Sequence, residues 1–325
     1  MLASTYDYEA LASELLRALR GERSQTAFAR RLGYKSNIVY SWEAGRAFPT
    51  AAKALWAAQR TGIDVRAALV SLYRKPPGSL ERLDATTPAG VVQFLNDLRG
   101  RSTVQQIAKA TGHNRFAVAR WFKGEAQPRL PDFLRLVEAT SLRLLDLLGG
   151  LVDPLELPSV RAAWSELELA RAATYSEPWS QAVLRALELG DYEKLPAHEP
   201  GWIARRLDIE PEREARALEL LLATGQIVMA RGRYEPLAET RVIDTRRDPA
   251  GAHALRVFWS EVALQRLRDQ AEGLFSHSVL AVSEFDLQRI RELQKAYYQE
   301  VRAIVAQSQP VERVALLNLQ ILALA

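Results

Sequence analysis

The chain has 325 residues, enough for two or three domains, and its 48% apolar and 25% charged residues are ordinary for a globular protein. It has no cysteine, which excludes disulfides, a thiolate nucleophile and a cysteine-based zinc finger, and no apolar run reaches the ~18 residues of a membrane span. The net charge of +4 is uneven: residues 1–150 hold 22 Lys/Arg against 13 Asp/Glu, and residues 151–325 hold 21 against 26. A basic first half favours contact with a polyanion.

The first 150 residues contain one pattern twice, 79 positions apart and without a gap. In "RRLGYKSNIVYSWEAGRAFPT" (30–50) and "KATGHNRFAVARWFKGEAQPR" (109–129), Gly is followed by Val after six positions, Trp after nine, Gly after twelve and Pro after sixteen. Two copies are too few for a solenoid in which neighbours share a core, so we expect each copy to fold as its own small domain. These domains are predicted at 1–75 and 89–150, joined by a Pro-, Gly- and Thr-rich linker at 76–88.

The apolar periodicity predicts that each copy is helical throughout. In the first copy Gly21 ends the first helix, Ser24 caps the second, and Gly33 permits a sharp turn into the third, which is expected from about Ser36 to Ala44. The predicted helices of this copy lie around residues 11–19, 25–32, 36–44, 50–59 and 63–73.

Two short helices joined by a turn that contains Gly are typical of the helix-turn-helix unit. Val39 and Trp42 lie three positions apart on one face of the third helix, and Val118 and Trp121 do so in the second copy. Burial of these pairs leaves the opposite face of the helix free to enter a major groove of DNA.

The candidate DNA-binding residues lie on that opposite face or beside the helix ends. Arginine suits the paired acceptors of guanine and asparagine suits adenine, while cations beside the terminating glycines can contact phosphates. We expect the second copy to be the stronger reader, because it carries two arginines and a lysine. The candidate residues are Gln25, Lys35, Ser36, Asn37, Tyr40, Ser41, Arg46, Thr103, Asn114, Arg115, Phe116, Arg120 and Lys123.

The stretch "SQTAFARRLGYKSNIVYSWEAG" resembles the Cro/CI-type, lambda-repressor-like helix-turn-helix repressors. In that family Ser-Gln-x-x-Leu-Ala opens the second helix, Gly-x-Ser and a polar pair open the recognition helix, and Glu-x-Gly ends it. The resemblance implies that Gln25 contacts a phosphate, that Ser36, Asn37 and Ser41 face bases, and that Glu43 is structural.

The second copy departs from this family pattern at three positions. Val104, Thr111 and Phe122 stand where the family has Gln, a core Leu and Glu. Asn114 is a good helix cap, and "RWFKGEAQP" resembles the Trp-x-x-Gly-x-x-x-Pro close of many such repressors. A helical protein-interaction module is the alternative for either copy.

Residues 151–250 are predicted to form a helical, winged-helix-like domain. A helix from Trp202 to Leu207, a second from Glu212 to Thr224 and a hairpin around Gly232 follow one another in the winged-helix order. The acidic start of the second helix would meet phosphate oxygens unfavourably. We therefore favour a packing or dimer-forming role for this domain over DNA binding.

Residues 251–325 are predicted to form a small α/β domain for dimerisation or sensing. Helices are expected at 252–272 and 284–306, the second opened by Ser283 with Asp286, and strands are expected at 274–282 and 314–324. With its "Leu-Asn-x-Gln" segment, the region from 175 to 325 resembles the carboxyl-terminal domain of a poorly characterised family of bacterial regulators. That resemblance implies a role beside transcription and names no ligand.

Nothing in the sequence favours an enzyme, a metal site or a cofactor. The four histidines have no partners at metal-ligand spacing, and neither a Walker loop, a dinucleotide Gly pattern nor a nucleophile elbow occurs. The amino-terminal residues lack the pattern of a signal peptide. We therefore expect a cytoplasmic protein that does not contact membranes.

The sequence thus predicts a mainly α, DNA-binding transcriptional regulator, of which repression is the expected action. Its parts are two tandem helix-turn-helix domains, a winged-helix-like domain and a small α/β domain, and its expected partners are double-stranded DNA and a second copy of the chain. One alternative is an antitoxin-like or phage-defence adaptor whose second half binds another protein. A second alternative is a regulator gated by a small effector or a peptide.

Overall fold

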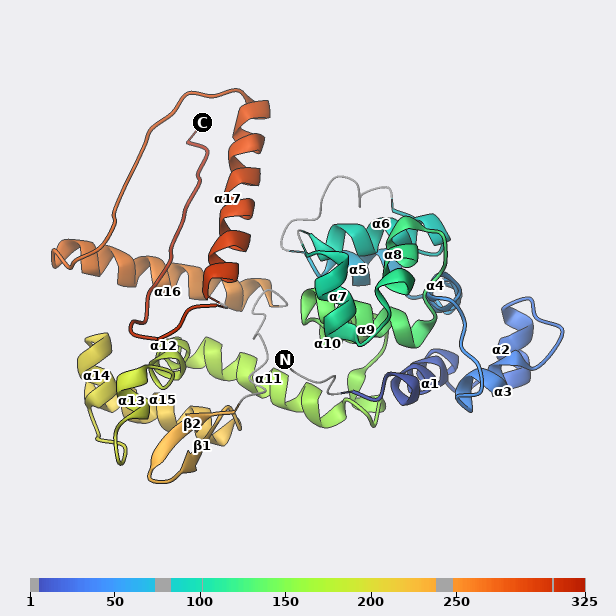
Figure 1. The fold of residues 1–325 in the computed structure, drawn as a ribbon, viewed down its shortest axis with the longest axis horizontal. Helices are drawn as coiled ribbons and strands as arrows, with labels where there is room; N and C mark the ends of the chain where they lie inside the picture. Colours follow the sequence, from blue (N-terminus) through green and yellow to red (C-terminus); the bar gives the residue numbers. More distant parts are fainter. Residues whose placement is uncertain (1–5, 74–82, 101, 238–247, 306, 325) are drawn as a thin grey trace. The chain divides into compact units, whose positions relative to one another are not determined.

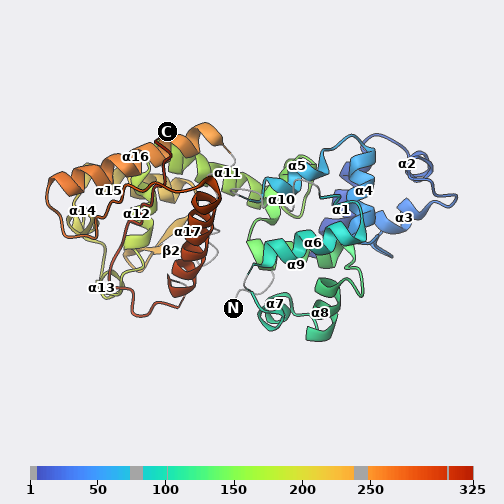
Figure 2. The ribbon, with the colours of Figure 1, turned by 90° about the horizontal axis from the view of Figure 1, so that it is seen from above.

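The computed structural model describes residues 6–73, 83–100, 102–237, 248–305 and 307–324. The chain forms two compact units: the described residues of unit 1 run from Tyr6 to Glu168, and those of unit 2 from Leu169 to Leu324. Both units are mainly helical (Figures 1 and 2). Within the described ranges no helix combines the length and the apolar character that crossing a membrane requires.

The two copies of the repeat have the same helical order. The first copy contains α1 (Tyr8–Arg20), α2 (Gln25–Arg31), α3 (Ile38–Glu43), α4 (Ala51–Arg60) and α5 (Val65–Val70). The second contains α6 (Pro88–Arg99), α7 (Val104–Thr111), α8 (Arg115–Lys123), α9 (Leu130–Ser141) and α10 (Leu144–Leu151). Most of the predicted linker, residues 76–82, lies outside the described residues.

An asparagine side chain caps the third helix of each copy. In the second copy Asn114 Oδ1 accepts a hydrogen bond from the Phe116 amide at 2.8 Å, as predicted. The aligned residue of the first copy is Lys35, whose ammonium has no acceptor. The cap there is Asn37, whose Oδ1 accepts from the Tyr40 amide at 3.4 Å. The predicted start at Ser36 was therefore too early by two residues.

The two copies share one hydrophobic core, in contrast to the separate domains expected from the sequence. Helix α1 packs against α9 of the other copy, α4 packs against α6 and α9, and α5 packs against α10. The buried apolar side chains of both copies form one continuous cluster that extends to Leu157, Val160, Trp164 and Leu167. The last two of these lie on the first half of α11 (Arg161–Ser176), so unit 1 ends beyond the predicted boundary at residue 150.

Unit 2 contains the helix–helix–hairpin order predicted for residues 202–236. Helix α14 (Trp202–Leu207) and α15 (Pro211–Ala223) are followed by the antiparallel strands β1 (Ile227–Ala230) and β2 (Arg233–Pro236). The connection between the strands has two residues, Arg231 at φ 52° and Gly232 at φ 80°. Positive φ at both positions suits a tight hairpin turn. Helices α12 (Trp179–Ala186), α14 and α15 with β1 enclose the core of this unit.

A buried polar network lies inside this core. Glu214 is 1% exposed, and its Oε2 accepts a hydrogen bond from the Ala204 amide at 2.6 Å. Its Oε1 lies 3.6 Å from His198 Nε2, while His198 Nδ1 lies 3.2 Å from the Tyr192 hydroxyl. That hydroxyl also accepts from the Tyr234 amide at 3.2 Å. The network joins α13 (Gly190–Glu193), α14, α15 and β2.

The predicted strands at 274–282 and 314–324 do not form; those residues are in neither helix nor strand. A strand needs a hydrogen-bonding neighbour, and the first segment leaves its apolar side chains in solvent, with Leu274 97% and Val279 83% exposed. Regular structure among the described residues from 251 onward consists of α16 (Pro249–Arg268) and α17 (Glu284–Val305). This part is therefore helical with extended segments and not α/β.

The carboxyl-terminal segment contacts both of these helices (Figure 1). Asn318 and Gln320, from the "Leu-Asn-x-Gln" motif, donate to Ser260 Oγ at 3.4 and 2.9 Å, and Gln294 donates to the Leu319 carbonyl at 3.4 Å. Side-chain amides of the motif, and not a strand ladder, hold this segment on α16.

Candidate nucleic-acid interface

The predicted anchors of both recognition helices are buried. Val39 and Val118 are 0% exposed, and Trp42 and Trp121 are 2% and 9% exposed. Burial of one valine and one tryptophan stabilises the packing of each helix against the core by about 3–6 kcal/mol. The face opposite these anchors is in solvent, as the helix-turn-helix pattern predicts.

In the first copy a charged cluster holds the end of α3. Arg20 donates two hydrogen bonds to the Glu43 carboxylate, from Nε at 2.6 Å and from Nη2 at 3.3 Å. Gln25 Nε2 donates to the same carboxylate at 2.8 Å. The Gln25 amide thus holds a buried acid, since Glu43 is 7% exposed, and the phosphate contact expected of Gln25 stays a prediction. This arrangement accounts for the structural role expected of Glu43.

The second copy replaces this cluster by an aromatic contact at the equivalent positions. Arg99 aligns with Arg20, and its guanidinium lies 4.9 Å from the centre of the Phe122 ring, which stands where the first copy has Glu43. Val104, which aligns with Gln25, is partly buried against the same core. A guanidinium is attracted both to a carboxylate and to the face of a ring. Phe122 and Val104 thus together take the places of Glu43 and Gln25, and the aligned arginine keeps a partner in both copies.

His113 makes a ring contact that has an equivalent in the first copy. Its ring meets Trp121 edge to face at 5.0 Å, as the Tyr34 ring meets Trp42 at 5.6 Å in the first copy. His113 Nε2 lies 3.1 Å from Asp132 Oδ1. Burial lowers the pKa of His113 below its ordinary value, an effect that Asp132 opposes. His113 therefore supports the recognition helix from within the unit.

The candidate residues of the first copy surround the start and the end of α3. Lys35, Ser36 and Asn37 are exposed and precede the helix. The prediction that Ser36 and Asn37 lie on the outward face of this helix is therefore wrong. Tyr40 is 47% exposed and its ring is covered by the Arg46 guanidinium at 5.2 Å. The remaining candidate of this helix, Ser41, is only half exposed.

The candidate residues of the second copy form a continuous outward face on α8. Arg115 and Arg120 are exposed, and Phe116 between them is 76% exposed. Within the described part of the chain no carboxylate lies within ion-pairing distance of either arginine. The exposed Lys123 lies 3.8 Å from Glu125. An unpaired pair of guanidiniums on a protruding helix matches the chemistry of base edges and phosphates.

The other two candidates of the second copy are helix caps. Asn114 caps α8, and Thr103 caps α7, where its hydroxyl and the Gln106 side chain form a reciprocal capping box. Both side chains are exposed, but each already binds a backbone amide. Their established contacts are structural, and a contact with DNA would have to be additional.

Helix α15, the second helix of the winged-helix order, is poorly suited to reading DNA. Its arginines Arg213 and Arg216 lie 4.0 and 3.8 Å from the Glu177 carboxylate, which reduces the positive charge that they offer to a phosphate. Glu214 faces inward and not toward solvent. One face of α15 therefore packs within unit 2, and its exposed face carries the acids Glu212 and Glu219.

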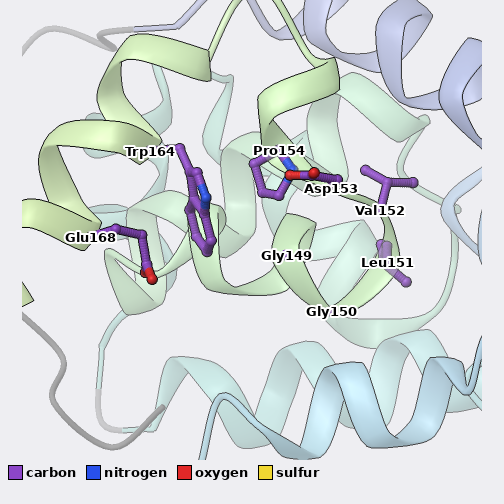
Figure 3. Close-up of a pocket in the computed structure, with 8 residues that line it drawn as sticks. All are labelled: Gly149, Gly150, Leu151, Val152, Asp153, Pro154, Trp164 and Glu168. Carbon is purple, nitrogen blue, oxygen red and sulfur yellow. The ribbon is translucent and has the colours of Figure 1, made fainter. Parts of the chain in front are cut away.

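Unit 1 also has an open depression of about 440 Å³. It is lined by residues 149–154, Trp164 and Glu168, with the indole directed into it (Figure 3). The charged groups of its lining are the carboxylates Asp153 and Glu168, and Asp153 is a helix cap that accepts from the Leu155 amide at 3.0 Å. No described group of three or more His, Asp or Glu could hold a metal ion.

Comparison with known proteins assigns the second half of the chain to a family. No curated protein and no solved structure matches the chain. Residues 159–324, just over half of the sequence, match the family described as a domain of unknown function, DUF4423. The match begins within unit 1, just before α11, and continues through unit 2 as far as Leu324. The chain therefore belongs to the DUF4423 family.

Proposed function

We propose that the chain is a sequence-specific regulator of transcription that binds double-stranded DNA through its two helix-turn-helix copies. The observation that carries this proposal is the outward face of α8, where Arg115, Phe116 and Arg120 are exposed and Val118 and Trp121 are buried behind them. Among the described residues no carboxylate pairs with either arginine. The net positive charge of residues 1–150 supports attraction to a polyanion. The resemblance to Cro/CI-type repressors supports repression, carried out in the cytoplasm.

Unit 2 is proposed to serve association and not DNA reading. The order of α14, α15 and the hairpin supports a winged-helix-like module, in which Arg213 and Arg216 lie beside Glu177. The exposed apolar residues of 274–282 favour contact with another surface, because patches of this kind mark interaction sites. The occupant we propose is a second copy of the chain; an adaptor role, with a different protein on the same residues, is the second candidate function.

The DNA-binding proposal is tested by selecting duplexes from a random pool with the purified full-length chain and measuring affinity for the selected duplex. Arg115→Ala and Arg120→Ala are each expected to weaken binding by about 1–3 kcal/mol and to relax the preference at one or two base pairs. Arg256→Ala, an exposed arginine on α16 in unit 2, is the matched control and should bind as the unmodified chain does. Failure of the pool to yield any enriched sequence would refute the proposal.

A further inference from the structure

The two copies are joined by a pair of backbone hydrogen bonds that are images of one another. The Ala51 amide donates to the Pro128 carbonyl at 2.9 Å, and the Leu130 amide donates to the Pro49 carbonyl at 2.9 Å. A shift of 79 residues converts Pro49 into Pro128 and Ala51 into Leu130. The antiparallel bridge between them pairs Thr50 with Arg129, which are themselves equivalent residues. A bridge of this form has a local two-fold axis between its strands.

The helix packing in unit 1 obeys the same symmetry. Helices α4 and α9 are equivalent and contact each other, and so are α5 and α10. The contact of α1 with α9 has its image in the contact of α6 with α4. Contacts in which the same surface is used on both sides are isologous and close on themselves, whereas successive units of a solenoid use two different surfaces. Unit 1 therefore resembles a two-fold dimer made within one chain.

This internal interface leaves little freedom for the copies to move apart. Arg143 is 7% exposed, and its Nη1 donates to the Leu72 carbonyl of the first copy at 2.5 Å. A Cβ added at Gly150 on α10 would lie 2.8 Å from the Ala68 Cβ on α5. Helices this close hold their relative position through direct backbone contact. The orientation of α3 relative to α8 is thus set by a packed core.

The rotation that exchanges the copies also exchanges α3 and α8 (Figure 2). Duplex DNA has two-fold axes perpendicular to its own axis, so a protein with two-fold symmetry reads inverted half-sites. The two helices nevertheless carry different side chains: Asn37 aligns with Phe116, Ser36 with Arg115, and Ser41 with Arg120. The half-sites should then be inverted in direction and unlike in sequence.

We infer that a single chain, with both of its repeat copies, occupies one complete DNA site. That site consists of two inverted, non-identical half-sites whose centres lie about one helical turn apart. Helix α8 contacts one half-site and α3, with the residues before it, contacts the other. The inference rests on the DNA-binding function proposed above. On this inference a single DNA site does not require a homodimer. Association of two chains through unit 2 would join two complete sites, so that the ratio of chains to sites would still be one.

Three duplexes test this inference. They are the site selected from a random pool, the same site with one half-site reversed into a direct repeat, and the same site with five base pairs inserted between the halves. The full-length chain is expected to bind the second and third at least about 10-fold more weakly than the first, because α3 and α8 cannot then reach both halves together. Native mass spectrometry of the first complex should show one chain per duplex, or two chains on two duplexes.

Helix variants assign the halves. Arg115→Ala should relax preference in one half-site only, and Asn37→Ala with Tyr40→Ala in the other only. Equal affinity for the direct repeat, two chains on one duplex with identical half-sites, or both variants acting on the same half would each overturn the inference while leaving DNA binding intact. Absence of any selected sequence would instead remove the proposed function itself.

Discussion

At the scale of single residues, the two copies show how one structural task is met by different chemistry. The end of the recognition helix is held by Arg20, Gln25 and Glu43 in the first copy and by Arg99 against the Phe122 ring in the second. Sequence alone shows only that Glu became Phe. The compensation becomes visible when the aligned arginine is found on the ring, because a guanidinium accepts either partner.

We predict that Glu43→Ala lowers the free energy of unfolding of unit 1 by about 2–3 kcal/mol. The substitution leaves the Arg20 guanidinium and the Gln25 amide without their buried partner. Chemical denaturation of the full-length chain measures the loss. Glu125→Ala, an exposed acid beyond α8, is the control and should change stability by less than about 0.5 kcal/mol. An equal effect of the two substitutions would contradict the structural role of Glu43.

A second prediction concerns His198 and pH. Burial lowers the pKa of His198 below its ordinary value, against the opposing effects of Glu214 and Glu199. The folded state therefore favours the neutral imidazole, so the contribution to stability is complete above about pH 6.5 and is lost as the pH falls from there toward the folded-state pKa. The stability advantage of the unmodified chain over His198→Gln should shrink between pH 7.5 and pH 5.

Thermal unfolding at both pH values checks this expectation. His253→Gln, on the exposed side of α16, is the control substitution and should leave the pH dependence unchanged. If His198→Gln costs the same stability at pH 5 as at pH 7.5, the neutral state assigned to His198 is wrong.

At the scale of elements, helical periodicity and caps could be predicted from the sequence, and the partners of each element could not. The helices of both copies, the burial of Val39 and Trp121, and the Asn114 cap follow from local pattern. The packing of α5 on α10 does not, because periodicity identifies an apolar face without naming what covers it. The predicted start of α3 is two residues too early because the cap is Asn37, and not Lys35, which aligns with the Asn114 cap of the second copy.

The predicted strands failed for a related reason. Alternating apolar residues at 274–282 are compatible with a strand, but strand formation depends on a neighbour that local sequence does not specify. In the structure these residues remain extended, with Val279 83% and Leu280 66% exposed. Such exposure in a long segment is itself evidence for a partner surface.

We predict that this segment supports self-association. Val279→Asp with Leu280→Asp should shift the full-length chain toward a monomer, because each buried contact would have to accommodate a charge. Mass photometry across a dilution series measures the shift, and Glu272→Ala, a change in a charged residue just before the segment, is the control. An unmodified chain that stays monomeric at every concentration would rule out the homodimer and leave a different protein as the occupant.

At the scale of the whole molecule, the basic first half and the acidic second half of the chain agree with the different roles proposed for the two units. Unit 1 contains the basic repeat and both recognition helices, and unit 2 contains the greater part of the DUF4423 match. Tandem copies that share one core hold α3 and α8, the two proposed recognition helices, in a fixed relation within a single chain. Neither the shared core nor its two-fold symmetry could be read from the repeat, because a gapless repeat is equally compatible with independent domains.

The most direct test of the central claim is the affinity of the full-length chain for its selected duplex as the salt concentration rises. If unit 1 contacts several phosphates through its exposed cations, the logarithm of the association constant should fall linearly with the logarithm of the salt concentration, with a slope of about −4 or steeper. The double substitution of Arg115 and Arg120 by Ala should make that slope shallower by about 1–2. Phosphate contacts weaken over a range of about 50 to 300 mM salt. An affinity that does not change over that range would contradict DNA binding through unit 1.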